Sequence, residues 1–390
     1  MNKVKLAVIG LGNMGAPHTR DIQLIPNAEL AAVCDIIPER AEQIAALYSI
    51  PAYTDYRDLI DNADIDGVIV ATPHYDHTPI SIYAMQHGKN VLCEKPLAVH
   101  VKDAQKMISS FEAEKTKNPN LVFAAMFQMR TSGYWQKVKN LIESGELGQL
   151  VRTTWIITEW FRTQTYYDLG GWRATWKGEG GGVLLNQCPH NLDLYQWLVG
   201  LPERVWGFAH IGKYHNIEVE DEVTGYFEHK NGMVGHFITT TAEAPGTNRL
   251  EVVGENGKLV CDKGKITFNR NRCSMLEDIK ISKAAFAKVE DWEINIPFSP
   301  DSGHPHRDIL QNYVNAIQNQ EPLIAPAPEG IRSVSLGNAI MLSSFTGKPA
   351  ALPLDGDEYE KHLLELINTS SFKKSAGNTT VTDISQSFSK

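Results

Sequence analysis

The chain has 390 residues, of which 42% are hydrophobic and 21% charged, and its formal net charge is −9 at pH 7. This is ordinary globular usage in a chain long enough for two domains, and it excludes a fully disordered, collagen-like or coiled-coil protein. The negative net charge and the absence of a basic block in the sequence argue against a nucleic-acid partner.

The sequence contains no apolar run of about 18 residues, so no membrane helix is expected. A glycine turn follows the first short apolar run, which argues against a secretory signal. The cysteines are odd in number and form no CxxC pair, which favours neither a disulfide framework nor a zinc site. We therefore expect no metal and a reducing, cytoplasmic setting. The five cysteines are Cys34, Cys93, Cys188, Cys261 and Cys273.

The first third of the chain alternates short apolar runs with amphipathic segments. The expected strands are residues 5–9, 30–34, 67–71, 90–93 and 121–125. The expected helices include residues 38–47, 78–87 and 101–115. Apolar strands separated by helices are typical of a parallel sheet covered on both faces. Residues 1–128 are therefore predicted to form a doubly wound α/β domain.

The pattern changes in the remainder of the chain. A helix is expected around residues 134–144, followed by a strand at 151–157 and, from Arg204 onward, strands separated by glycine-containing hairpin turns. Two late helices are expected at residues 306–318 and 329–345. Residues 129–368 are thus predicted to form an α+β domain with an open, mostly antiparallel sheet. The Ser/Thr-rich residues 369–390 are predicted to be a frayed, disordered tail.

A glycine motif of the form GxGxxG follows the first strand and opens a helix. Gly10 permits a tight turn, Gly12 lets the backbone approach a pyrophosphate, and Gly15 allows the helix to pack closely on the strand. Asp35 ends the second strand about 20 residues later, where an acid binds the adenosine ribose. The predicted dinucleotide contacts are Gly10, Gly12, Asn13, Met14, Gly15 and Asp35.

The cofactor is expected to be NAD. The carboxylate of Asp35 would repel a 2′-phosphate, and Ile36 and Ile37 offer no compensating cation. Arg40 lies close enough in sequence to leave NADP possible.

Two further segments end strands at the carboxyl edge of the sheet, where ligands of open α/β folds bind. Thr72 and Pro73 are expected to border the ribose or the nicotinamide. His77 is a further candidate for cofactor contact, although such a histidine more often caps a helix or lies at the surface. Glu94 and Lys95 end the next strand, and Lys95 could hold an alkoxide-like charge. An exposed lysine before a turn is the alternative.

A glycine run at residues 180–182 precedes a second polar cluster. Asn186, His190 and Asp193 are expected at positions i, i+4 and i+7 of one helix, on the same face. A polar stripe on an otherwise apolar helix indicates a catalytic site. A buried histidine whose hydrogen bonds are satisfied internally is the alternative.

Six aromatic residues lie between positions 160 and 177, a far higher share than the 9% of the whole chain. Aromatic faces stack on sugar rings, so this segment is expected to line a substrate site through Tyr166, Trp172 and Arg173. Arg162, Arg173 and Lys177 leave open an anionic sugar, such as a uronate or a sugar phosphate. Packing at a domain or subunit interface is the alternative.

The three glycines of the first motif, the Glu94-Lys95-Pro96 segment and the glycine run followed by His190 and Asp193 together resemble the Gfo/Idh/MocA oxidoreductases. The resemblance covers nearly the whole chain, from residue 4 to about residue 354. It implies a Rossmann domain followed by an α+β domain whose open sheet commonly mediates assembly, here as a homodimer or homotetramer. It also implies hydride transfer between a sugar or cyclitol carbinol and nicotinamide.

The resemblance assigns roles to individual residues. Lys95 matches the family lysine that binds the reacting oxygen and cofactor, and His190 matches the general acid/base. Asp193 matches a later aspartate that could bind a substrate hydroxyl or orient His190. Asn186 replaces an aspartate of many members, so Lys95 is expected to be less basic here.

Two positions at the predicted domain junction also follow from the resemblance. Gln128 is expected to contact the cofactor, and Arg130 the substrate. Glu94 is expected at the cofactor as part of the Glu-Lys-Pro segment.

The leading hypothesis is therefore an NAD-dependent dehydrogenase of a sugar, glycoside or cyclitol. The alternative is a glycoside-cleaving enzyme that oxidises its substrate, eliminates the aglycone and returns the hydride without net NADH formation. A non-enzymatic NAD-binding sensor is a third hypothesis, which the presence of Lys95 and His190 disfavours.

Overall fold

The computed structural model describes residues 2–169 and 171–372, and its first sheet has six parallel strands in the order β3-β2-β1-β4-β5-β6. The central strands are apolar and almost fully buried, because helices cover both faces. This is the doubly wound arrangement predicted from the sequence. The strands are β1 (Val4–Ile9), β2 (Ala28–Cys34), β3 (Ala52–Tyr53), β4 (Gly67–Val70), β5 (Asn90–Cys93) and β6 (Phe123–Ala125).

The helices of this layer include one from much later in the chain. Helix α10 (Pro305–Asn319) packs against α1 and β1, so a segment assigned by sequence to the second domain lies on the first sheet. The amide of Ala125 also donates to the carbonyl of Ala325. The other helices are α1 (Gly15–Gln23), α2 (Pro38–Tyr48), α3 (Tyr56–Asn62), α4 (His74–Gln86) and α5 (Val101–Lys117).

The second sheet has nine strands in the order β14-β13-β12-β11-β7-β10-β9-β8-β15. Every neighbouring pair is antiparallel except β7 and β10, which confirms the predicted mostly antiparallel sheet. The strands are β7 (Leu150–Ile157), β8 (Arg204–Ile211), β9 (Glu220–Glu228), β10 (Val234–Thr240), β11 (Asn248–Gly254), β12 (Gly257–Asp262), β13 (Lys265–Asn271), β14 (Asp291–Ile296) and β15 (Ala350–Ala351).

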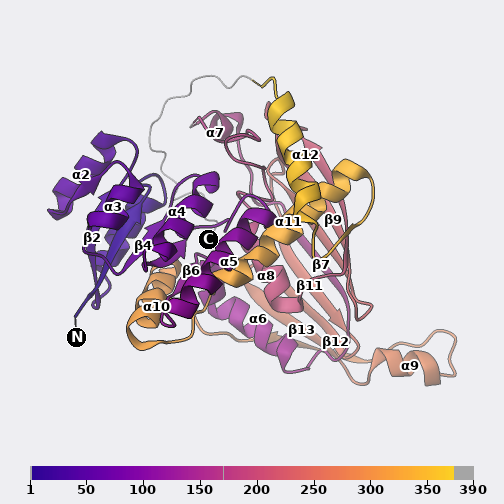
Figure 1. The fold of residues 1–390 in the computed structure, drawn as a ribbon. Helices are drawn as coiled ribbons and strands as arrows, with labels where there is room; N and C mark the ends of the chain where they lie inside the picture. The colour runs from indigo at the N-terminus through magenta and orange to yellow at the C-terminus, as the bar shows by residue number, and fades with distance from the viewer. Residues whose placement is uncertain (1, 170, 373–390) are drawn as a thin grey trace.

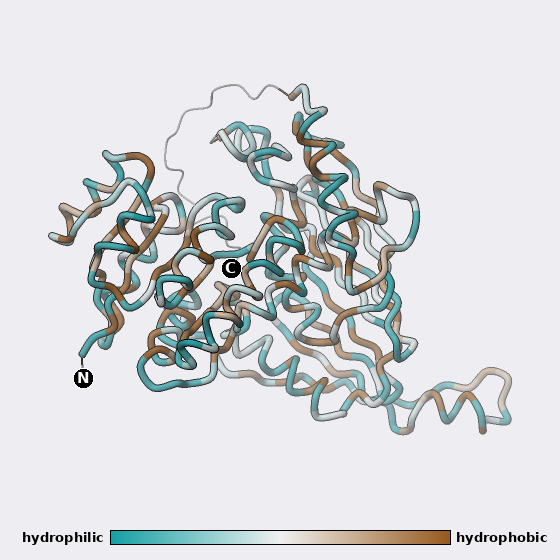
Figure 2. The backbone as a smooth tube through the Cα atoms, viewed as in Figure 1, coloured by the Kyte–Doolittle hydropathy of each residue, from teal (hydrophilic) through white to brown (hydrophobic). Residues whose placement is uncertain are grey.

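Burial alternates along the inner strands of this sheet, so one face is packed and the other is more exposed. Helix α11 packs on the covered face against β8 and α8, and α8 packs against α6. Figure 2 shows hydrophobic segments running along the strands and the helices that cover them. Beyond the far edge, α9 (Met275–Ile281) extends away from the body of the protein. The remaining helices are α6 (Gly133–Glu143), α7 (Gln164–Asp168), α8 (Pro189–Val199), α11 (Gly330–Thr346) and α12 (Gly356–Thr369), with short 3₁₀ turns η1 (Gln128–Thr131) and η2 (Ala327–Glu329).

One helix begins later than the sequence pattern predicts. Residues 183–187 form turns, and α8 starts at Pro189. Proline fits the first helical turn because it needs no amide donor there. The expectation that Asn186 shares a helix face with His190 and Asp193 is therefore wrong.

Two further expectations concern the C-terminal tail and membrane-spanning helices. The predicted tail begins at Thr369, which is the last residue of α12, and its residues 373–390 lie outside the described part of the chain. Within residues 2–169 and 171–372, no helix combines the length and the apolar character that a membrane crossing requires.

Candidate active site

The glycine motif forms the turn between β1 and α1. A side chain at Gly10, whose φ is +88°, would place its Cβ 2.7 Å from the carbonyl oxygen of Ala71. A Cβ at Gly15 would lie 1.7 Å from the carbonyl oxygen of Gly10. A Cβ at Gly12 would meet none of the described atoms within 4 Å. Gly10 and Gly15 are thus required by the fold, whereas Gly12 leaves its backbone open to a ligand. Asn13 and Met14, between them, are partly exposed.

Asp35 lies at the end of β2 and faces this turn. Its carboxylate accepts hydrogen bonds from the amides of Leu11 (2.8 Å) and Ile37 (3.0 Å), and it is only 5% exposed. The guanidinium of Arg40 approaches the same carboxylate at 3.3 Å. The predicted ribose-binding acid is therefore held beside the glycine turn by backbone donors.

The turn after β4 brings Thr72, Pro73 and His77 to the same edge. The hydroxyl oxygen of Thr72 is buried and has no hydrogen-bond partner among the described residues, and Pro73 is exposed. The two ring nitrogens of His77 face the carbonyl oxygens of Pro96 (2.8 Å) and Thr72 (2.9 Å). The ring of His77 therefore links two loops of the site, and its expected cofactor contact stays a prediction.

Lys95 follows β5, and its ammonium group donates to the backbone carbonyl of Asn186 at 2.9 Å. Burial lowers the pKa of Lys95; the charges of Glu94 and Glu179 oppose this effect, while those of Arg173 and Arg162 add to it. The lysine is thus a desolvated cation held at the junction of the two sheets.

Glu94 is buried beside Lys95 and is engaged within the protein. One carboxylate oxygen accepts a hydrogen bond from His18 of α1 (2.8 Å), and the other accepts from the amide of Lys95 (3.1 Å). Burial by itself raises the pKa of Glu94, but the hydrogen bond and charge of His18, with His306 and Lys95, lower it to about 2. The carboxylate of Glu94 thus pairs with His18 and braces Lys95, and the expected cofactor contact of Glu94 stays a prediction.

His190 lies in the first turn of α8 and contacts Gln128 of η1. Its Nε2 lies 3.2 Å from the side-chain nitrogen of Gln128, whereas its Nδ1 is buried without a hydrogen-bond partner among the described residues. The side-chain oxygen of Gln128 is also buried without a hydrogen-bond partner among the described residues. Burial lowers the pKa of His190 far below its ordinary value, and the charge of Lys95 lowers it further. His190 is therefore a neutral base with one open nitrogen.

Asp193 and Arg130 form a buried ion pair one turn away. The guanidinium donates through two nitrogens to the two carboxylate oxygens of Asp193, at 2.8 and 2.6 Å. Its third nitrogen donates to Glu329 at 2.6 Å, and both Arg130 and Asp193 are 1% exposed. Gln196 also donates to Asp193.

Two site predictions concern this ion pair and stay predictions. All three guanidinium nitrogens of Arg130 bond within the protein. The carboxylate oxygens of Asp193 accept hydrogen bonds from Arg130 and Gln196. The pair holds η1, which carries Gln128, against α8, which carries His190.

Asn186 contacts Lys95 through its backbone, while its side chain turns to Glu179. The side-chain amide donates to one carboxylate oxygen of Glu179, and the amide of Ala174 donates to the other at 2.6 Å. Glu179 is 2% exposed, and Arg173 lies 4.0 Å from it. Sequence reasoning missed Glu179, although an acid inside a glycine run ahead of the polar cluster was a signal that could have found it.

The aromatic segment divides into a packed part and a part that contacts Arg173. Tyr167 and Trp176 are buried at 2% and 3% exposure and belong to the core. Tyr166 accepts hydrogen bonds from Arg173 (2.7 Å) and from Gln187 (3.1 Å), a residue that sequence reasoning also missed. The guanidinium of Arg173 lies over the ring of Trp172 at 4.7 Å. The predicted substrate residues Tyr166, Trp172 and Arg173 are thus brought together.

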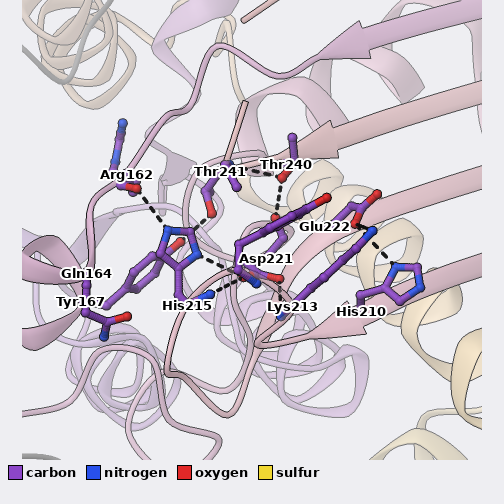
Figure 3. A network of polar contacts seen from close by, with 12 residues as sticks. Arg162, Gln164, Tyr167, His210, Lys213, His215, Asp221, Glu222, Thr240 and Thr241 are labelled. Carbon is purple, nitrogen blue, oxygen red and sulfur yellow. Dashed lines mark hydrogen bonds and ion pairs between the residues drawn. The ribbon is translucent and has the colours of Figure 1, made fainter. Parts of the chain in front are cut away.

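A polar network anchors this segment to the second sheet (Figure 3). His215 joins the buried carboxylate of Asp221 (2.9 Å) to the carbonyl oxygen of Arg162 (3.0 Å). The amide of Arg162 donates to the carbonyl of Thr241, and the hydroxyl of Tyr167 donates to the side chain of Thr241. The backbone at Arg162 is therefore fixed relative to the ends of β9 and β10.

The sequence matches two profiles of one family. Residues 4–119 match an oxidoreductase family with an NAD-binding Rossmann fold, and residues 135–260 match the GFO/IDH/MocA C-terminal domain. Together these segments span more than half of the chain.

Similar proteins include two that are named as inositol dehydrogenases. The chain is 37% identical over 149 residues to the inositol 2-dehydrogenase of Salmonella paratyphi B, but this match covers 37% of the chain and only 43% of that relative. It is 24% identical over 361 residues to the scyllo-inositol 2-dehydrogenase (NAD(+)) of Bacillus subtilis, covering 90% of the chain and 97% of the relative.

A similar solved structure is the WlbA dehydrogenase from Chromobacterium violaceum in complex with NADH and UDP-GlcNAcA. It superposes with a TM-score of 0.77 at 26% identity and covers 91% of this chain and 97% of that one. The family resemblance of the motifs is confirmed by these matches. The chain therefore belongs to the Gfo/Idh/MocA oxidoreductases, whose N-terminal domain is an NAD-binding Rossmann fold.

Proposed function

We propose that the protein is an NAD-dependent dehydrogenase that transfers a hydride between a carbinol of a sugar or cyclitol and nicotinamide. The observation that carries this proposal is a set of buried polar atoms left open at the carboxyl edge of the first sheet. These are the hydroxyl of Thr72, the side-chain oxygen of Gln128 and Nδ1 of His190, none of which has a partner among the described residues. Buried polar atoms are usually paired, so a ligand is expected to complete them.

The residues of the first sheet fit the cofactor. The open backbone at Gly12 suits a pyrophosphate at the start of α1, and Asp35 suits the adenosine ribose. Thr72 and Gln128 offer unpaired groups for the nicotinamide end. Bound NAD would supply the carbon that accepts or returns the hydride. The carboxylate of Asp35 favours NAD over NADP, although Arg40 lies near it.

Lys95 and His190 divide the remaining chemistry. The ammonium group of Lys95 holds the reacting oxygen and stabilises the negative charge that develops on it. His190, whose pKa is lowered by burial and by Lys95, is neutral and takes the hydroxyl proton at the ring nitrogen that carries no hydrogen. Asn186 acts as a positioning residue, since its carbonyl directs the lysine and its side chain bonds to Glu179.

The relatives support this substrate class. The Bacillus subtilis relative acts on a cyclitol, and the WlbA structure holds NADH with a sugar nucleotide. By this proposal, residues 1–128 bind the cofactor, helped by α10, and residues 129–368 bind the substrate and mediate assembly. A homodimer or homotetramer would form through the more exposed face of the second sheet. Free cysteines, four of them buried, are consistent with a reducing, cytoplasmic setting.

The test is to follow reduced nicotinamide during incubation with NAD, and separately NADP, and a panel of inositols, hexoses, uronates and aryl glucosides. NADH accumulation with one class, faster with NAD than with NADP, is the expected result. Product analysis of every mixture distinguishes the alternatives. Cleavage of a glucoside without NADH accumulation would replace the proposal with an NAD-cycling glycosidase. An unchanged panel with tight NAD binding would favour a sensor.

A further inference from the structure

Resting on the proposed function, we infer that His74 is a specificity-determining residue whose Nε2 accepts a hydrogen bond from a substrate hydroxyl other than the one that is oxidised. His74 is the first residue of α4 and directly follows Thr72 and Pro73 at the carboxyl edge of the first sheet. It is 5% exposed. The chemistry divided between Lys95 and His190 leaves this buried polar residue of the site without a role.

One ring nitrogen of His74 is bonded within the protein, and this bond sets the state of the other. Nδ1 lies 3.1 Å from the backbone carbonyl oxygen of Glu179. A carbonyl oxygen only accepts hydrogen bonds, so Nδ1 carries the hydrogen. Burial lowers the pKa of His74 well below its ordinary value, and the charges of His77 and Lys95 lower it further, so the ring is neutral. In a neutral ring with its hydrogen on Nδ1, Nε2 is an acceptor.

Nε2 of His74 is the nitrogen left for a ligand. It makes no hydrogen bond within residues 2–169 and 171–372. It is also not completely enclosed, unlike Nδ1 of His190 and the hydroxyl oxygen of Thr72, which are buried unpaired atoms. An acceptor with solvent access bonds to water in the free enzyme and can exchange that water for a ligand hydroxyl.

Hydrogen bonds connect His74 to the loops that hold Lys95. The residue whose carbonyl bonds to His74 is Glu179, and its carboxylate accepts a hydrogen bond from the side chain of Asn186. The carbonyl of Asn186 in turn accepts the hydrogen bond of Lys95 at 2.9 Å. Three residues after His74 on α4, His77 bonds to the carbonyl oxygen of the proline that follows Lys95. His74 therefore lies in the same bonded set of loops as the reacting lysine.

The indole of Trp172 lies beside His74 and gives the acceptor an aromatic neighbour. The two ring centres are 5.2 Å apart, and the ring planes meet at 72°. The hydroxyl of Tyr75 donates to the carbonyl of Trp176 at 2.8 Å, so the start of α4 contacts the aromatic segment at two points. A sugar or cyclitol presents C–H faces beside hydroxyl groups, so Trp172 suits its ring and Nε2 suits one hydroxyl.

A hydroxyl group could also come from the ribose of the cofactor. The contact of His74 with Trp172 favours the substrate, because the aromatic segment belongs to the second domain and carries the predicted substrate residues. If His74 served only to hold the loop through Nδ1, its loss would affect all sugars alike. Discrimination between sugars that differ in one hydroxyl is therefore the property that separates the two roles.

The experiment compares substrates that differ by a single hydroxyl. The probes are myo-inositol, D-glucose and the singly deoxygenated analogues of each, with NAD as the cofactor. For a parent that the enzyme oxidises, one analogue that keeps the reacting carbinol should have a kcat/KM about 10- to 100-fold lower, because Nε2 loses its donor. The loss should appear mainly in KM.

Variants of His74 test whether this preference arises at Nε2. His74→Phe keeps a ring beside Trp172 but has no acceptor, so the preference for the parent should disappear. His74→Gln places an amide oxygen near the position of Nε2 and should restore part of it. The matched control is His87→Phe at the other end of α4, which should keep the preference. Nδ1 of His87 also faces a backbone carbonyl oxygen (2.8 Å), and its ring stacks on Tyr83, but it lies at the surface.

A binding readout keeps this inference separate from the proposed function. NMR spectra of protein labelled at the histidine ring nitrogens are recorded with NADH alone and with NADH plus myo-inositol or D-glucose, and the His74→Phe variant assigns the signals. Nε2 of His74 should resonate as a nitrogen without hydrogen and should move when a parent sugar is added. Such a movement without turnover would support the inference while the dehydrogenase proposal fails.

Four results would overturn the role of His74. A movement of Nε2 that is complete with NADH alone would assign His74 to the cofactor. The absence of any movement with either parent would leave Nε2 without a substrate contact. Equal kcat/KM for an oxidised parent and all its analogues, or a preference that is unchanged in His74→Phe, would show that this residue does not determine specificity.

Discussion

His190 and Asp193 lie three residues apart on α8, yet their surroundings differ completely. Nδ1 of His190 and the side-chain oxygen of its neighbour Gln128 are buried without partners among the described residues. Asp193 and its neighbour Arg130 are equally buried, but every charged atom is bonded. We propose that a ligand completes the first pair, whereas the second pair holds η1 against α8. A polar pattern in sequence does not distinguish these two cases, because both place charged or polar residues on the same helix.

The largest expected effect is on catalysis and concerns Lys95 and His190. Lys95→Met and His190→Ala should each lower kcat/KM by about 10²- to 10⁴-fold, because each removes a group that acts on the reacting oxygen or its proton. The unfolding midpoint should stay close to that of wild type. Steady-state kinetics and thermal unfolding provide the two readouts, with Lys230→Met as the control, since Lys230 is an exposed lysine in the turn between β9 and β10. Normal turnover in either site variant would remove that residue from the mechanism.

Substitutions in the ion pair of Arg130 and Asp193 should lower the free energy of unfolding. Asp193→Ala leaves the charge of Arg130 buried beside a missing partner and should reduce the free energy of unfolding by about 3–5 kcal/mol. Denaturant titration measures this loss, and the double variant Arg130→Met/Asp193→Leu should recover part of it. An Asp193→Ala protein that unfolds like wild type but has a much lower kcat would show that Asp193 takes part in catalysis.

A smaller effect is expected at Glu179, which links the two sheets through Asn186. Glu179→Gln removes a charge that raises the pKa of Lys95, so that pKa should fall and the loss of activity at alkaline pH should move to lower pH. The accompanying fall in kcat/KM is about tenfold, as for a hydrogen bond to a charged group. The swapped variant Glu179→Gln/Asn186→Asp keeps one carboxylate and one amide in contact and should restore both. A purely structural role would leave the pH profile unmoved.

The smallest effect concerns the pH profile of the wild type. The pKa of His190 lies well below its ordinary 6.5, so the base stays neutral and kcat/KM for oxidation should not fall as pH decreases to 6.5. The pKa of Lys95 lies below its ordinary 10.5, so the loss of its charge should lower activity before that pH is reached. Rates measured across this range at constant ionic strength test both limbs. An acid limb centred at or above pH 6.5 would contradict the neutral, buried state of His190.

Local sequence patterns predicted the parts of the site that are formed by neighbouring residues. Gly10, Gly12, Gly15 and Asp35 are governed by one turn and the strand beside it, so their spacing was sufficient. Lys95 could be placed because it follows a strand at the carboxyl edge. The two-sheet architecture followed from the change in strand pattern after the first third of the chain.

The parts that could not be predicted depend on contacts between distant segments. Sequence does not reveal that Arg130 and Asp193 pair with each other. The start of α8 at Pro189 moved Asn186 out of the helix and toward Glu179. Helix α10 packs on the first sheet, although no periodicity within its own sequence indicates this contact. In each case the tertiary partner decided the role of the residue.

The most direct test of the site follows the hydride itself. A substrate identified by the panel is deuterated at the carbinol carbon and incubated with NAD, and the reduced nicotinamide is analysed by mass spectrometry and NMR. We expect deuterium in the nicotinamide product with wild type, and at least 100-fold slower transfer in a Lys95→Met/His190→Ala double variant, the lower bound of about 10² for losing such groups. Product without deuterium, or undiminished transfer by the double variant, would contradict hydride transfer at Lys95 and His190.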